Sequence, residues 1–172
     1  MIPAGVTRIG GNAFSGCEAL ASIVLPSKLK TLMGGAFART AITEVTIPDG
    51  CEEILYGAFA HCKSLETVTL PRSMKKMSDK AFGGCDALKT LIVTNPTPVV
   101  SNKKEDLAGL ADLSAMSELT LVVPEGAKDA YTAADGWKEF ANVSEMLTLT
   151  AAVSAEKPLE GTITALTTPE LY

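Results

Sequence analysis

Hydrophobic and polar positions alternate along the first part of the chain in units of 22 or 23 residues. Aliphatic-proline pairs occur at Ile2-Pro3, Leu25-Pro26, Ile47-Pro48 and Leu70-Pro71, spaced by 23, 22 and 23 residues. Phenylalanines that follow an alanine repeat at the same intervals, at Phe14, Phe37, Phe59 and Phe82. Because both markers share one period and shorten together in one unit, they indicate a structural repeat.

Each unit is predicted to hold three elements. In residues 65–70, Leu65, Val68 and Leu70 face one way while Thr67 and Thr69 face the other, which is the period of a strand. The proline ends that strand. A second apolar pair follows in each unit, which predicts a second short strand; these pairs are Val6/Ile9, Leu29/Leu32, Cys51/Ile54 and Met74/Met77. The Ala-Phe segment comes next and is predicted to be one helical turn.

No unit can bury its own apolar face, so the units must stack. Each fully buried Leu, Ile or Phe contributes roughly 1.5–3 kcal/mol, and stacking makes that burial continuous. The predicted fold is therefore an α/β solenoid of coils of about 23 residues, with short parallel strands and short helical turns.

The period fails after Val93, and residues 94–145 are predicted to close the array. Leu107, Leu110, Leu113 and Met116 recur every three residues, which favours a short amphipathic helix packed on the last regular coil. A strand ending in proline returns at residues 119–124, and a helical cap is expected at 125–140.

The cap offers Trp137 and Phe140 as large apolar side chains to seal the open end of the solenoid. Sugar stacking by Trp137 beside Tyr131 is the alternative. The expected domains are a solenoid with its cap at 1–145 and a separate tail at 146–172, which is either a hairpin or the start of another domain.

The four cysteines follow the repeat. Cys17, Cys62 and Cys85 share one slot, which Thr40 fills in the second unit, and Cys51 takes an aliphatic slot. All four are therefore predicted to be buried free thiols that pack as small hydrophobes. A disulfide or metal site is the alternative, and Cys62 and Cys85 on adjacent coils are the pair to examine.

No catalytic motif is present, so we expect no enzyme activity and no cofactor or metal. His61 lies in a turn slot that glycine holds in other units, which predicts an exposed imidazole. The net charge of −5 and the lack of a basic cluster argue against nucleic-acid binding. No apolar stretch approaches the roughly 20 residues that span a bilayer, so we expect no membrane insertion by this chain, and a monomer.

The remaining candidate for function is the outer surface of the predicted sheet. The outward strand positions stack from coil to coil into a threonine-rich face of low charge, and regular solenoid faces are extended binding surfaces. The alternative is that threonine is simply a good exposed strand former. The candidate partner-binding residues are Ser22, Val24, Glu44, Thr46, Thr67, Thr69, Thr90, Ile92, Thr120 and Val122.

The unit Ile-Pro-x-x-Val-x-x-Ile-Gly-x-x-Ala-Phe-x-x-Cys-x-x-Leu-x-x-Ile, read from Ile2 to Ile23 and recurring to Leu91, closely resembles the BspA-like (Treponema pallidum type) leucine-rich repeat. The segment from Val123-Pro124 to Phe140 is similar to the ending of such arrays. The resemblance covers about residues 1–145. Thr40 for cysteine and Cys51 for an aliphatic residue are departures from the pattern, and neither threatens the fold.

The resemblance implies a bacterial surface or secreted protein that adheres to host matrix or cell-surface proteins. It supplies no catalytic residues. A structural spacer that projects a neighbouring domain and a glycan-binding module are the alternative functions. The repeat begins directly after Met1 with no signal peptide before it, so we expect a fragment whose targeting signals lie outside these residues.

Overall fold

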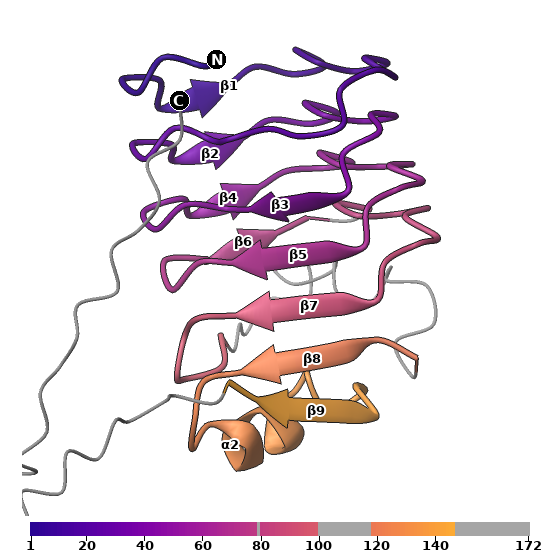
Figure 1. The fold of residues 1–172 in the computed structure, drawn as a ribbon. Helices are drawn as coiled ribbons and strands as arrows, with labels where there is room; N and C mark the ends of the chain where they lie inside the picture. The colour runs from indigo at the N-terminus through magenta and orange to yellow at the C-terminus, as the bar shows by residue number, and fades with distance from the viewer. Residues whose placement is uncertain (79, 100–117, 147–172) are drawn as a thin grey trace, which may run out of the picture.

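The chain folds into a stack of coils joined by parallel strand pairing (Figure 1). The computed structural model describes residues 1–78, 80–99 and 118–146. In chain order its elements are β1 (Arg8–Ile9), β2 (Thr31–Leu32), β3 (Glu44–Thr46), β4 (Glu53–Ile54), β5 (Thr67–Leu70), β6 (Lys76–Met77), β7 (Thr90–Val93), β8 (Thr120–Val123), α2 (Lys128–Ala133) and β9 (Asn142–Glu145).

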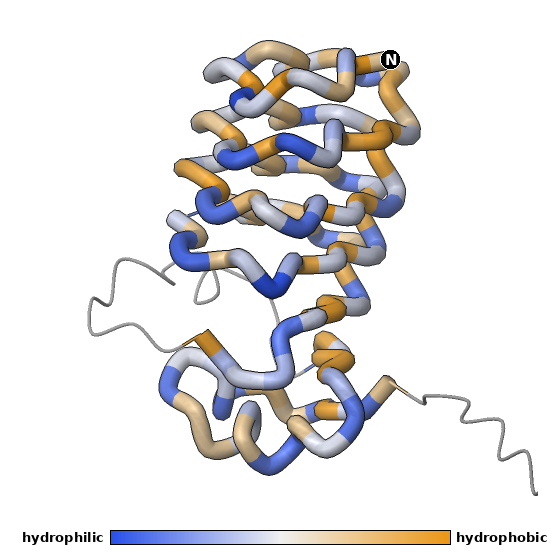
Figure 2. Tube along the Cα trace, turned by 90° about the vertical axis from the view of Figure 1, so that its left-hand side faces the viewer, coloured by the Kyte–Doolittle hydropathy of each residue, from blue (hydrophilic) through white to orange (hydrophobic). Residues whose placement is uncertain are grey.

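These strands form two sheets that enclose the core. One sheet has the order β1-β2-β4-β6 and the other β3-β5-β7-β8-β9, with parallel pairing throughout. Three successive turns contribute to both sheets, through β2 and β3, β4 and β5, and β6 and β7, so two strands per unit are confirmed for these turns. The first unit has β1 alone, and β8 and β9 belong only to the five-stranded sheet. Figure 2 views the stack edge-on, with hydrophilic and hydrophobic positions alternating along each coil.

Equivalent positions of successive coils stack in the core. The rings of Phe14, Phe37, Phe59 and Phe82 form a column with centroids 5.1, 5.3 and 5.3 Å apart. Phe37 and Phe59 are fully buried, whereas Phe14, in the first coil, is partly exposed. The column joins neighbouring coils through side chains, beside the hydrogen bonds of the two sheets.

The Ala-Phe segments are hydrogen-bonded turns and not α-helix. In the third coil, Ala58 N–H donates to the Leu55 carbonyl at 3.1 Å, which closes a four-residue turn. Phe59 N–H donates instead to the Ala81 carbonyl of the next coil, at 2.8 Å. Gly57 and His61, with positive φ of 62° and 59°, bracket this segment and prevent helical continuation.

Three of the four cysteines are buried, as predicted, and the prediction for Cys17 is wrong because it is exposed. The Cys62 and Cys85 thiols each donate, at 3.1 Å, to the carbonyl of the phenylalanine one coil earlier, Phe37 and Phe59. No described coil precedes the one that holds Cys17. Its thiol is therefore not covered by a neighbouring coil of the described residues, and it has no phenylalanine carbonyl there to accept its hydrogen bond. All four thiols are free.

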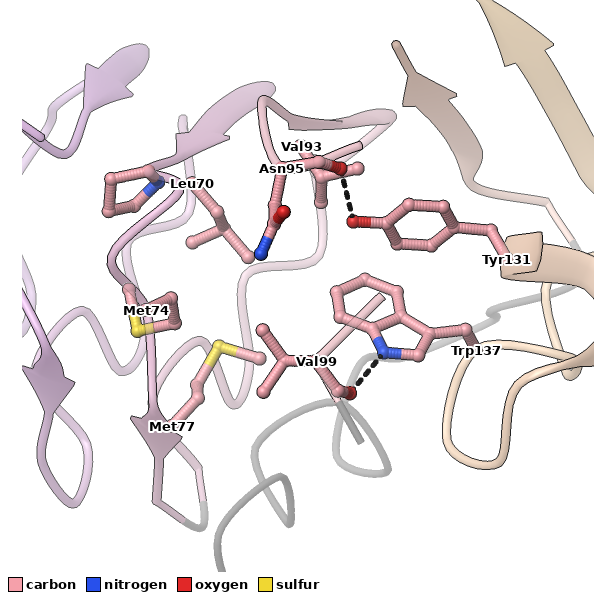
Figure 3. Close-up of a pocket in the computed structure, with 9 residues that line it drawn as sticks. Leu70, Met74, Met77, Val93, Asn95, Val99, Tyr131 and Trp137 are labelled. Carbon is pink, nitrogen blue, oxygen red and sulfur yellow. Dashed lines mark hydrogen bonds between the residues drawn. The ribbon is translucent and has the colours of Figure 1, made fainter. Parts of the chain in front are cut away.

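The cap closes the other end of the stack. Tyr131 and Trp137 are buried and meet edge to face, with ring centroids 5.0 Å apart. Their polar atoms reach back to the main chain: Tyr131 Oη donates to the Asn95 carbonyl at 2.8 Å and Trp137 Nε1 to the Val99 carbonyl at 2.9 Å (Figure 3). Capping is therefore confirmed over sugar stacking for these two aromatic residues.

The helix of the cap is short, and its first turn is completed by a distant residue. No side chain of the preceding residue caps α2, and Glu145 at the end of β9 accepts from the Lys128 N–H at 3.0 Å. A carboxylate at a helix N-terminus is favourable there because it meets unpaired N–H donors. The predicted helix at 107–116 lies outside the described residues, as does the predicted tail at 146–172 apart from Met146, and the boundary at 145 stays a prediction.

Candidate interaction surface

The outward side chains of the five-stranded sheet form two rows that run across the coils. Strand pairing aligns the first row as Glu44, Thr67, Thr90, Thr120 and Asn142. It aligns the second as Thr46, Thr69, Ile92, Val122 and Ser144. Because the intervening residues point into the core, both rows lie on one face, here called the threonine face.

The structure brings eight of the ten sequence-predicted surface residues into these two rows. Ser22 and Val24 are exposed but belong to no strand. Their segment is held in line by the Thr43 N–H, which donates to the Ala21 carbonyl at 3.2 Å, as equivalent bonds do between later coils. Among the described residues, this segment has a neighbouring coil on one side only. It therefore extends the threonine face but makes no regular strand pairing.

Sequence reasoning missed the last strand of the face. β9 adds Asn142 and Ser144 to the two rows, in register with Thr120 and Val122 of β8. The segment lacks the strand-proline signature and holds only one inward apolar residue, Val143. The alternation of Val143 between two polar neighbours was the one available signal.

The chemistry of the threonine face is neutral at its centre and charged at its margin. Ile92 and Val122 are half-buried neighbours in the middle of the second row. Just before the strands, Lys89 and Glu66 form an exposed ion pair at 3.2 Å. An apolar centre within a polar, charged rim is the usual arrangement of a protein interface.

Catalytic chemistry has little support among the described residues. Within residues 1–78, 80–99 and 118–146, no three metal-ligating side chains come together. His61 is exposed, as predicted. Burial raises the pKa of the Cys51 thiol to about 11, which disfavours the reactive thiolate near neutral pH. The pocket between the last regular coil and the cap (Figure 3) has a cavity of about 10 Å³, room for about one water.

The repeat is matched by a known family. The model of the BspA type leucine rich repeat region matches residues 1–103 in six copies. The chain belongs to this family. In the structure the unit of 22 or 23 residues forms one coil, and its phenylalanine and proline positions lie in the core and at the turns.

Two solved structures have a similar fold. A leucine-rich repeat protein from Bacteroides ovatus ATCC 8483 has a TM-score of 0.52 and 25% identity, over 84% of this chain and 44% of that one. The pneumococcal vaccine antigen PcpA has a TM-score of 0.62 and 20% identity, over 84% of this chain and 34% of that one. The chain thus spans less than half the length of either. No curated protein matches its sequence.

Family and fold together imply a protein-interaction or structural module. Such modules are typically not enzymes. Among the helices of the described residues, none is long and apolar enough to cross a membrane.

Proposed function

We propose that this BspA-type array is a non-catalytic binding module of a bacterial surface or secreted protein, and that it adheres to host matrix or cell-surface proteins through the threonine face. The observation that carries the proposal is the continuity of this face over β3, β5, β7, β8 and β9, whose two aligned rows are neutral except for Glu44 on the first strand. The pneumococcal vaccine antigen among the similar structures supports a surface location.

Threonine suits such a contact for physical reasons. Its hydroxyl can donate and accept hydrogen bonds, and its β-branched side chain loses little freedom on binding because it is already restricted. A partner that covers Thr67, Thr90 and Ile92 would desolvate no full charge. Burying an unpaired charge is among the larger costs of association, so a neutral centre favours binding.

The size of the face sets an expected affinity. Five strands about 4.8 Å apart and about four residues long cover roughly 19 by 13 Å, or about 250 Å². A standard interface buries about 800 Å² on each partner. Contact must therefore extend onto the rim, and we expect a Kd in the micromolar range, corresponding to about −8 kcal/mol.

The test uses paired lysines on and off the face. Thr67 and Thr90 are register partners on β5 and β7, so Thr67→Lys/Thr90→Lys places two charges side by side at the centre. The control, Thr7→Lys/Ser27→Lys, adds the same charge at exposed positions outside the face. Binding of each folded variant to purified extracellular-matrix glycoproteins is measured by surface plasmon resonance at physiological salt.

We expect the central pair to weaken binding at least tenfold while the control binds as the parent does. Equal binding by both variants would move the site elsewhere on the solenoid. Failure of the parent to bind any matrix glycoprotein or cell surface would favour the alternative in which the array is a spacer that projects a neighbouring domain.

A further inference from the structure

Four residues other than glycine adopt the left-handed backbone conformation in the described part of the chain, and all four line one groove. They are Asn12, Arg39, His61 and Lys80, with φ between 54° and 59°. This conformation is costly for residues with a Cβ, and such strain concentrates at functional sites. The residues that line the groove follow the short strands β1, β2, β4 and β6 in the chain. These strands form the sheet that does not carry the threonine face (Figure 1).

The repeat itself shows that these side chains are not needed for folding. Each coil has two left-handed slots, and the first is filled by Asn12, Gly35, Gly57 and Lys80 in succession. The second slot is filled by Gly16, Arg39, His61 and Gly84. Glycine could adopt the left-handed conformation at every one of these positions. Instead, the first slot holds Asn12 in the first coil and Lys80 in the fourth, and the second slot holds Arg39 and His61 in the two central coils. The result is a ring of four polar side chains.

Glycines also line this groove. A Cβ on Gly35 would collide with the Asn12 side chain. On Gly34 it would come within 3.1 Å of the Tyr56 carbonyl oxygen. Glycine at these two positions therefore lets the neighbouring coils pack closely, and an open groove of about 620 Å³ lies beside them, within the usual size of ligand sites.

The groove is cationic in a chain of net charge −5. Arg39 and Lys80 supply the positive charge, and no carboxylate occurs among the lining residues in the described part. Arg39 takes part in none of the ion pairs found within residues 1–78, 80–99 and 118–146. Tyr56 stands at the same groove with 59% of its surface exposed.

We propose that this groove binds an anionic oligosaccharide. The Arg39 guanidinium is suited to a sulfate or carboxylate, because its fork of donors matches two anionic oxygens at once. Lys80 adds a second cation, and Asn12 offers amide groups to sugar hydroxyls. The exposed Tyr56 ring suits the apolar face of a pyranose. The groove offers no deep apolar pocket for the side chains of a peptide.

The test measures binding of a heparin-derived hexasaccharide and a hyaluronan hexasaccharide by isothermal titration calorimetry at low and physiological salt. The variants are Arg39→Gly and Tyr56→Ala, with Arg8→Ala as the charge-matched control on exposed β1. Arg39→Gly installs the residue that the first and fourth coils already carry in this slot, so it should fold as the parent does.

We expect the parent to bind, Arg39→Gly to weaken binding about tenfold, and Arg8→Ala to leave it unchanged. Binding of heparin alone identifies sulfate as the required group, and binding of both sugars shows that carboxylate suffices. The proposal would be overturned if the parent bound neither sugar, or if Arg39→Gly and Arg8→Ala lost the same affinity. It would also be overturned if polyglutamate bound as tightly as the sugars and Tyr56→Ala left the affinity for polyglutamate unchanged. None of these outcomes depends on the threonine face.

Discussion

Truncation of Phe59 tests whether the phenylalanine column holds the coils together. The ring is fully buried and stacks on Phe37 and Phe82, each with centroids 5.3 Å away. Phe59→Ala removes this buried surface and leaves a cavity between two coils that hydrogen bonds hold in place, so little collapse is expected. We expect the free energy of unfolding to fall by about 3–5 kcal/mol. Phe14 is partly exposed and stacks on one ring only, so Phe14→Ala should cost about 1–2 kcal/mol.

The assay is equilibrium unfolding in urea, followed by far-UV circular dichroism for the sheets and by Trp137 fluorescence for the cap. Two probes are needed because coils of a repeat array can unfold separately. The control, Val24→Ala, alters a side chain that is 85% exposed and should change stability by less than about 0.5 kcal/mol. Equal losses for Phe59→Ala and Phe14→Ala would refute the column as the structure has it.

The structure also predicts the reactivity of the cysteines, the effect of replacing Arg39 and the pH dependence contributed by Tyr131. At pH 8 a thiol reagent should modify Cys17 in the native protein, and the other three cysteines only after unfolding, because those thiols are buried; rapid native labelling of Cys51 would contradict this. Arg39→Gly should leave the free energy of unfolding unchanged or raise it by up to about 1 kcal/mol, since glycine tolerates positive φ; urea titration would expose any larger fall. Burial raises the pKa of Tyr131 to about 12, so its contribution to stability is complete below the unfolded pKa of about 10 and is lost as pH rises toward 12. Thermal midpoints should therefore fall less steeply over that interval in Tyr131→Phe than in the parent.

The solenoid could be predicted because its determinants are periodic. Pro71 and Pro124 directly follow strands β5 and β8, as the sequence predicts, and the alternation of Val68 with Thr67 and Thr69 fixes which side chains enter the core. Eight of the ten surface residues followed directly from that register. Periodicity is informative here because each coil must match its neighbours in length and phase to keep the core continuous.

The repeat pattern did not predict features that depend on the ends of the stack or on differences between repeats. Cys17 occupies the slot of Cys62 and Cys85 but has no described coil above it, so equal sequence positions have unequal burial. β9 was missed because Val143 alone marks its inward face. The cationic groove depends on differences between repeats, at slots where Arg39 and His61 replace glycine, and a search for the shared motif passes over such departures.

The most direct test of the threonine face as the binding surface is side-chain footprinting of the complex with a matrix glycoprotein. Hydroxyl radicals would oxidise exposed aliphatic and aromatic side chains of the chain, free and saturated with partner, and mass spectrometry would locate each site. The account predicts protection of Ile92 and Val122, which sit at the centre of the face, and unchanged oxidation of Tyr56, which lies in the separate groove. Protection of Tyr56 with Ile92 and Val122 unprotected would contradict it.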